Sequence, residues 1–196
     1  MKTFELVGTP RSEYGKKAAK TFRKENLVPC NLYGNGENVT FTVTVDDVRK
    51  LIYCPDTMAV ALTIGETKKM AVVKELQFHP VTEQLFHIDF LEVTEEKPVT
   101  VAIPVQLQGH AEGVKAGGKL TMNMRKLKVK ACYTEIPERL VINVDNLGLG
   151  KSMKVATLAY DNIEIMTSKE VVVCAVRMTR AARAAAAQEA VAKGKK

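Results

Sequence analysis

The chain has 196 residues, of which 46% are hydrophobic, and a formal net charge of +7. This hydrophobic content suits a globular protein with a core, and no run of eighteen apolar residues is present, so the sequence predicts no membrane span. The N-terminal residues lack an extended apolar stretch and include Glu5, which argues against a signal peptide.

The positive charge is concentrated in two short segments. Residues 11–25 carry six basic and two acidic side chains, and residues 177–196 carry six basic and one acidic, while the rest of the chain sums to about −2. Such clustering is expected of a protein that binds a polyanion.

The first predicted helix runs from about Lys16 to Glu25. At 100° per residue its cations share an arc of roughly 120°, with Ala18 and Phe22 on the other side. That arc suits a row of phosphates, and the alternative is a solvated surface helix. Arg11 and Tyr14 flank the helix. The arginine can form bidentate hydrogen bonds to phosphate, and the tyrosine ring can stack on a base or pack against the protein. The cations of the arc are Lys16, Lys17, Lys20, Arg23 and Lys24.

Most of the remaining chain has the β-branched pattern of strands. Residues 40–45 and 58–64 are predicted to form strands. A turn at 65–66 leads from the second of these into residues 70–73, which predicts a hairpin. A second helix opens at Asp46 as its N-cap, with Val48, Leu51 and Ile52 on one face. Further strands are predicted over residues 86–93, 99–108, 127–132, 140–144 and 171–176.

A boundary is expected at residues 92–98, where three glutamates and a proline indicate an exposed linker. The predicted fold is mainly β with a few short helices. Its predicted parts are a β-rich domain over residues 1–94, a second β-rich domain over 95–178, and an alanine-, lysine- and arginine-rich flexible tail over 179–196.

The four cysteines lie far apart and form no C-x-x-C pair. The expectation is that all four are buried, reduced thiols of a cytosolic protein. They are Cys30, Cys54, Cys132 and Cys174.

A second polar cluster comprises Gln77 and His79, followed by His87 and Asp89. If each pair lies on a strand, its two members point to the same face. Four roles are open for this cluster. It can contact base edges, brace the sheet through hydrogen bonds, act in general acid–base chemistry, or hold a metal ion at His79, His87 and Asp89. No nucleophile with a positioned base accompanies the cluster, and the chain lacks a phosphate-binding glycine loop.

These residues, in this order, resemble the bacterial large-subunit ribosomal proteins that bind 5S ribosomal RNA. The resemblance spans about residues 1–177, and the second half resembles the long two-domain members called general stress protein CTC. The motifs that carry it are Arg11, Gly15-Lys16, Arg23, Pro29, Tyr33-Gly34, Gln77, His79-Pro80 and His87-x-Asp89-Phe90, then Pro104-Val105, Gly109, Gly117-Gly118-x-Leu120 and Ile136-Pro137.

The resemblance implies a β-barrel bound to the internal loop of 5S RNA, followed by a mainly β domain. The chain departs from the family at Phe78, where relatives often have arginine, and at Thr21, where many have a basic residue. The expected RNA-binding residues are Arg11, Lys16, Lys17, Lys20, Arg23, Tyr33, Gln77, His79, His87 and Asp89.

The resulting hypothesis is a non-enzymatic, cytoplasmic constituent of the large ribosomal subunit that binds 5S RNA and other subunit components. No cofactor, metal, membrane or small-molecule substrate is expected. Two alternatives are a free cytosolic RNA-binding stress protein and a metal-dependent enzyme that uses the histidine–aspartate cluster.

Overall fold

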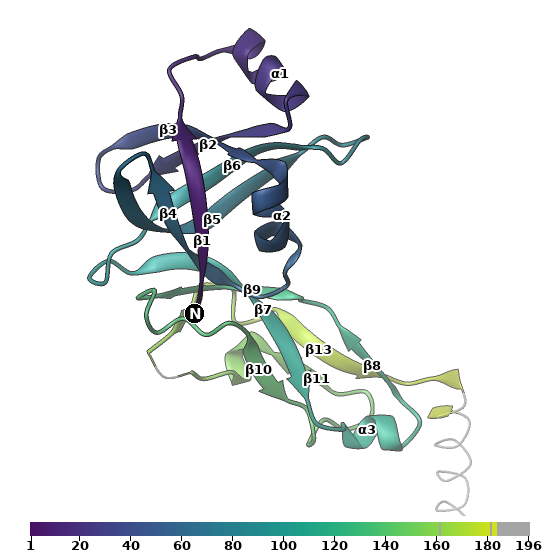
Figure 1. Cartoon of the computed structure of the whole chain (residues 1–196). Helices are drawn as coiled ribbons and strands as arrows, with labels where there is room; N and C mark the ends of the chain where they lie inside the picture. The colour runs from purple at the N-terminus through teal and green to yellow at the C-terminus, as the bar shows by residue number, and fades with distance from the viewer. Residues whose placement is uncertain (161, 181, 184–196) are drawn as a thin grey trace, which may run out of the picture. The chain divides into compact units, whose positions relative to one another are not determined.

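The computed structural model describes residues 1–160, 162–180, 182 and 183 (Figure 1). The described chain is mainly β, as predicted, and forms two compact units: residues 1–101 with 131–138, and residues 102–130 with 139 onward. The domain boundaries expected after residues 94 and 178 remain predictions. Most of the tail expected over 179–196 lies outside the described residues. No helix of the described chain is long and apolar enough to cross a membrane.

The first unit is a closed six-stranded barrel in the order β1-β3-β2-β6-β5-β4. Two parallel pairings, β1 with β4 and β2 with β6, complete a ladder that is otherwise antiparallel. The strands are β1 (Lys2–Pro10), β2 (Leu27–Tyr33), β3 (Asn38–Thr44), β4 (Met58–Ile64), β5 (Thr67–Phe78) and β6 (Leu85–Glu92).

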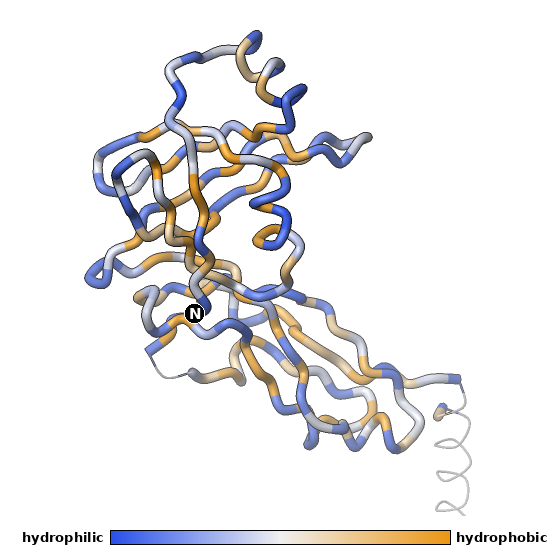
Figure 2. The backbone as a smooth tube through the Cα atoms, viewed as in Figure 1, coloured by the Kyte–Doolittle hydropathy of each residue, from blue (hydrophilic) through white to orange (hydrophobic). Residues whose placement is uncertain are grey.

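The barrel interior is packed with aliphatic and aromatic side chains. On β6, Ile88 and Phe90 are fully buried, whereas His87 and Asp89, which alternate with them, are partly exposed. This alternation is typical of a strand with one face in the core. The Phe90 ring lies 5.7 Å from that of Phe41 across the interior. Burial of each such ring stabilises the fold by about 1.5–3 kcal/mol. Figure 2 shows the hydrophobic residues concentrated along these strands and the hydrophilic ones along the loops.

The two predicted helices of this unit are present as α1 (Lys16–Lys24) and α2 (Val45–Tyr53). The cap predicted at Asp46 is wrong. Thr44, the last residue of β3, is the N-cap, and its hydroxyl accepts a hydrogen bond from the Asp47 backbone N–H at 3.3 Å. Asp46 lies instead in the first turn, where its charge complements the helix dipole.

The second unit contains a four-stranded sheet in the order β10-β7-β9-β12 and a three-stranded sheet in the order β11-β13-β8. Strand β7 begins in the first unit and continues into the second. The elements are β7 (Val99–Gln108), α3 (Glu112–Lys115), β8 (Lys119–Met122), β9 (Lys126–Ala131), β10 (Leu140–Asn143), β11 (Ser152–Lys154), a 3-10 turn (Val155–Thr157), β12 (Glu164–Ile165) and β13 (Val172–Arg177).

The four cysteines form no disulfide, in agreement with the sequence, but only two of them are buried. Cys30, inside the barrel, and Cys174 are enclosed, and burial raises the pKa of both thiols. Cys54 and Cys132 are partly exposed, so the expectation of four buried thiols was wrong for these two.

Candidate nucleic-acid interface

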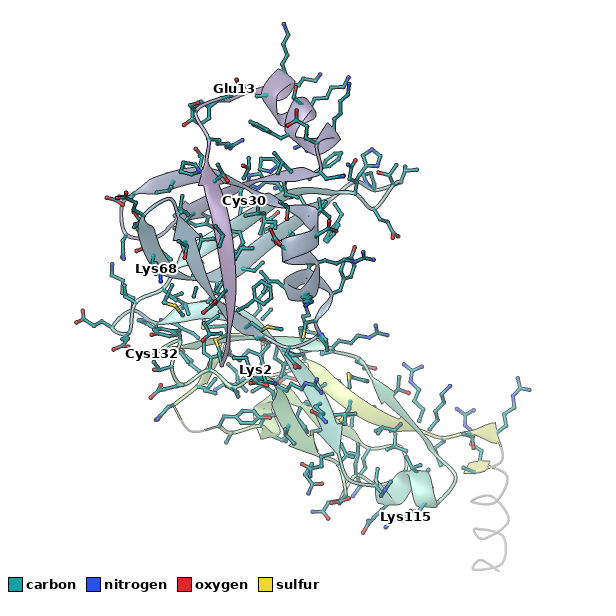
Figure 3. All side chains as sticks on the ribbon, viewed as in Figure 1. Lys2, Glu13, Cys30, Lys68, Lys115 and Cys132 are labelled. Carbon is teal, nitrogen blue, oxygen red and sulfur yellow. The ribbon has the colours of Figure 1, made fainter. Side chains whose placement is uncertain are left out.

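Helix α1 presents the cationic surface that its sequence predicted. Lys16, Lys17, Lys20 and Lys24 are exposed, and within the described chain their ammonium groups make no ion pair. The helix has no acidic residue in its first turn and no side-chain cap. Lys16 and Lys17 therefore face the positive end of the helix dipole, which costs stability and leaves a site favourable to anions. Figure 3 shows long side chains of α1 that project away from the barrel.

The opposite face of α1 attaches the helix to the barrel. Ala18 is buried, and Arg23 is partly buried because its guanidinium stacks on the Phe86 ring of β6 at 4.4 Å from the ring centre. Its Nε and Nη2 both donate to the Phe86 carbonyl oxygen, at 3.3 and 3.2 Å. Arg23 thus positions the cationic surface, whereas the sequence grouped it with the lysines.

Beside α1, a row of polar residues crosses the outer face of the barrel. The row starts at Arg11, which directly follows β1. The backbone N–H of Arg11 donates to the Thr40 carbonyl oxygen on β3. Thr40 is the register partner of Asn31 on β2, and Asn31 is the partner of Asp89 on β6. Asp89 is in turn paired with Glu75 on β5. These pairings align the side chains of Thr40, Asn31, Asp89 and Glu75, one from each of four neighbouring strands, in a row that runs across the strands from Arg11.

Arg11 is held in this row by side-chain contacts. Its Nη2 donates to Asn31 Oδ1 at 3.3 Å, and its guanidinium carbon lies 5.7 Å from the centre of the Tyr14 ring. Tyr14 donates to the Arg11 carbonyl at 3.4 Å and accepts from Thr40 at 3.3 Å. Arg11 Nε is buried with no hydrogen-bond partner among the described residues. A charged donor left in this state is costly, so a further acceptor is expected at this position.

His87, Asp89 and Gln77 form the second part of the polar face. His87 Nδ1 lies 3.5 Å from Asp89 Oδ1, and the two side chains are 18% and 21% exposed. Gln77 on β5 is the register partner of His87, so the two are neighbours on the same face. Burial lowers the pKa of His87, Arg11 and Arg23 lower it further, and Asp89 opposes them. His87 is therefore held toward its neutral form.

His79 does not join this face. It lies one residue beyond the end of β5, so the strand alternation that was expected to pair it with Gln77 does not reach it. Its Nδ1 accepts the backbone N–H groups of Val81 and Thr82 at 3.2 and 3.0 Å, and its ring packs edge-on against Phe86. His79 therefore shapes the β5–β6 turn.

The metal-site alternative finds no support in the geometry. Across the described ranges, no group of three or more histidine, cysteine, aspartate or glutamate side chains is arranged to hold a metal ion.

One sequence candidate, Tyr33, and the two departures from the family pattern remain. Tyr33 is exposed at the end of β2, and burial together with the nearby charges of Asp89 and Glu75 raises its pKa. Phe78, one of the two departures from the family pattern, is 41% exposed at the end of β5. Thr21, the other departure, donates to the Lys17 carbonyl within α1.

Three contributors were missed by the sequence. Asn31 and Thr40 complete the row from Arg11 to Asp89, and Phe86 carries Arg23. A single asparagine or threonine in a strand gives no pattern, since its role depends on which strands become neighbours. The stack of Arg23 on Phe86 joins residues 63 apart in the sequence, so only the fold could have revealed it.

The fold and this surface define a two-unit, mainly β protein with a basic helix beside a polar barrel face. Comparison with known proteins identifies its family. The Ribosomal L25p family matches residues 6–90, and the C-terminal domain of ribosomal protein TL5 matches residues 98–180. This chain belongs to the ribosomal L25p family, in the long form that carries the TL5-type C-terminal domain.

The most similar relatives compared are each named large ribosomal subunit protein bL25. The protein of Porphyromonas gingivalis is 58% identical over 191 residues, which cover 96% of this chain and all of the relative. That of Parabacteroides distasonis is 56% identical over 194 residues, with the same coverage. That of Bacteroides thetaiotaomicron is 51% identical over 192 residues, covering 95% of this chain and 98% of the relative.

This membership confirms the resemblance seen in the sequence. It makes the chain a structural, non-enzymatic ribosomal protein, so the metal-dependent enzyme is set aside.

Proposed function

We propose that this protein is a constituent of the large ribosomal subunit that binds 5S ribosomal RNA through α1 and the adjoining polar face of the barrel. The observation that carries the proposal is the combination of four unpaired lysines on α1 with a buried, unpartnered Arg11 Nε on the neighbouring face. A surface of this kind combines phosphate contacts with groups that can read bases.

The two parts of the surface have different roles. Lysines on α1 are exposed point charges, suited to phosphates and therefore to binding that is tolerant of sequence. The barrel face holds amide, imidazole and carboxylate groups in fixed positions, suited to hydrogen bonds with base edges. Selectivity for one RNA thus belongs to the barrel face, and much of the affinity to α1.

Asp89 fits this division although it is negative. A carboxylate near phosphates is repelled unless it accepts hydrogen bonds from a base amino group or orients a donor. Asp89 lies beside His87 and opposite Asn31, which places donors and acceptors around it. Tyr33 and Phe78 supply exposed rings on which bases could stack.

The geometry revises the set of residues assigned to RNA contact. Arg23 and His79 are assigned to positioning, because Nε and Nη2 of Arg23 and Nδ1 of His79 are engaged in hydrogen bonds within the chain. Asn31 joins the contact set through its bond to Arg11. The proposed contact residues are Arg11, Lys16, Lys17, Lys20, Asn31, Tyr33, Gln77, His87 and Asp89.

Capture of RNA from cell extract by the full chain tests the proposal. A single RNA species of 5S length, together with co-sedimentation with the large subunit at moderate salt, is the expected result. Capture of many RNAs and sedimentation apart from ribosomes would favour a free RNA-binding stress protein instead. The Arg11→Gln variant should lose the preference for 5S RNA, whereas Lys68→Gln, at an exposed site on the β4–β5 hairpin (Figure 3), should keep it.

A further inference from the structure

The two compact units differ strongly in charge. Residues 1–101 with 131–138 contain 13 basic and 16 acidic side chains, so the barrel unit is slightly negative despite α1. The second unit, residues 102–130 with 139–196, contains 16 basic and 6 acidic side chains. The excess positive charge of the chain therefore lies in the unit to which the proposed function assigns no RNA contact.

Part of this charge forms a regular row on one strand. On β9, Lys126, Lys128 and Lys130 are exposed, while Leu127, Val129 and Ala131 between and after them are buried. The three lysines thus share the outer face of the sheet, at intervals of about 7 Å along the strand. In the described chain, none of their ammonium groups is engaged in an ion pair or hydrogen bond.

The other strands of this sheet leave the row open. On β7 and β10 the outward residues Gln106, Gln108 and Val141 are exposed and carry no charge. The acidic side chain that the described strands place on this face is Glu164, the register partner of Lys130 on β12. Glu164 can offset the charge of Lys130, so Lys126 and Lys128 remain uncompensated.

We infer that the outer face of the sheet β10-β7-β9-β12 is a second RNA-binding surface, which holds a phosphate backbone along the row of Lys126, Lys128 and Lys130. Evenly spaced like charges repel one another unless a partner supplies evenly spaced negative charge, and a phosphodiester chain does so. The cores of protein–protein interfaces are depleted in lysine and rich in aromatic residues, whereas nucleic-acid interfaces are strongly positive, which favours RNA over an acidic protein.

This inference goes beyond the proposed function, because it concerns the other unit and binding without sequence preference. The side chains on the row are point charges with flexible stems, which contact phosphates but do not read bases.

Binding of the full chain to a short RNA duplex of unrelated sequence, measured by fluorescence anisotropy at several salt concentrations, tests the inference. The row variant combines Lys126→Gln, Lys128→Gln and Lys130→Gln. The control variant combines Lys115→Gln, Lys151→Gln and Lys169→Gln, which removes the same charge from exposed positions of the same unit (Lys115 is labelled in Figure 3).

The row variant should bind the duplex roughly tenfold more weakly or worse and lower the salt slope by about two to three units, as expected when up to three phosphate contacts are lost. The control should change affinity by less than about threefold, since loss of net charge alone acts weakly at moderate salt. The matching lysine-to-arginine row variant should keep wild-type binding. Circular dichroism and thermal unfolding should be unchanged in all three.

Equal losses in the row and control variants would overturn the inference, because net charge alone would then explain the binding. Unchanged duplex binding by the row variant, with lost binding to polyglutamate, would overturn it in favour of an acidic protein partner. The preference for 5S RNA over the duplex should survive in the row variant. Duplex binding by the row variant therefore still tests the second surface if the proposed role of the barrel in 5S RNA binding is wrong.

Discussion

The guanidinium of Arg23 lies 4.4 Å from the centre of the Phe86 ring and donates two hydrogen bonds to the Phe86 carbonyl oxygen. These contacts join α1 to β6, the strand that carries His87 and Asp89. Together with the buried Ala18, Arg23 therefore fixes the orientation of the exposed lysines relative to the polar barrel face, and its planar guanidinium with two donors suits this role.

The Arg23→Lys variant keeps the charge but loses the stack and one of the two bonds. It should lower the free energy of unfolding by about 2–4 kcal/mol, the sum of about 0.5–1 kcal/mol for a partly exposed cation–π contact and about 1.5–3 kcal/mol for a charged hydrogen bond. Urea unfolding at neutral pH measures this. Lys24→Gln, an exposed change in the same turn, should leave stability within about 0.5 kcal/mol of the wild type. If Arg23→Lys is as stable as Lys24→Gln, the contact does not hold α1.

The lysines of α1 are expected to act separately from that anchor. Lys16→Ala or Lys20→Ala should weaken 5S RNA binding and lower the salt slope by about one unit each, as loss of one phosphate contact does. Stability should not fall, because both side chains are exposed. Titration of labelled 5S RNA at several salt concentrations gives both quantities, with Lys68→Ala as the control. A variant with wild-type affinity and slope would exclude that lysine from phosphate contact.

The features that the sequence predicted well are those carried by local pattern. The cationic arc of α1 depends on 3.6-residue periodicity, and strands such as β7 and β13 depend on runs of β-branched residues. The error at the second helix has the same origin. Thr44 and Asp46 are both good capping residues, and the choice between them requires knowing where β3 ends.

The features that it missed depend on long-range pairing. Strand β1 was not predicted, because Gly8 and Pro10 weaken its strand pattern, yet its parallel pairing with β4 closes the barrel. The polar row from Arg11 to Asp89 exists only because β3, β2 and β6 become neighbours. The pairing of β2 with β6 also explains why the motif has glycine at position 34. Gly34 has a φ of +151°, and a Cβ at this position would lie 2.9 Å from the Glu92 backbone oxygen.

His87 should make stability depend on pH. Burial is the main cause that holds its pKa below the ordinary 6.5. The unfolded chain therefore binds more protons than the folded chain below about pH 6.5, and stability is lost as the pH falls from there toward the folded-state pKa. The wild type should lose more unfolding free energy than His87→Gln between about pH 7 and pH 5. Parallel losses in the two proteins would mean that other groups carry the effect.

The first 95 residues should suffice for selective RNA binding. All six barrel strands end by Glu92, and the proposed contact residues lie between Arg11 and Asp89. The fragment loses the ion pair of Lys2 with Glu138 and the backbone bond from Thr57 to Glu138, so it should fold with reduced stability. Its ratio of 5S affinity to duplex affinity should equal or exceed that of the full chain, because the fragment lacks the lysine row of the second unit. A folded fragment without that preference would assign the selectivity elsewhere.

Asp89 provides the sharpest test of the barrel face, because it is negative where an RNA is proposed to bind. Asp89→Asn keeps the shape and replaces one acceptor oxygen with a donor. If Asp89 accepts from a base amino group, 5S binding should weaken by roughly 1–3 kcal/mol, while binding to unrelated RNA stays equal or improves slightly. The same variant removes the charge that raises the pKa of His87, so the histidine should titrate at lower pH still, as seen by NMR of its ring. Glu66→Gln, on an exposed residue of the β4–β5 turn, raises the net charge by the same amount and serves as the control for changed charge. Tighter 5S binding by Asp89→Asn would exclude Asp89 from recognition, and unchanged binding with a lower melting temperature would mean that it braces the sheet.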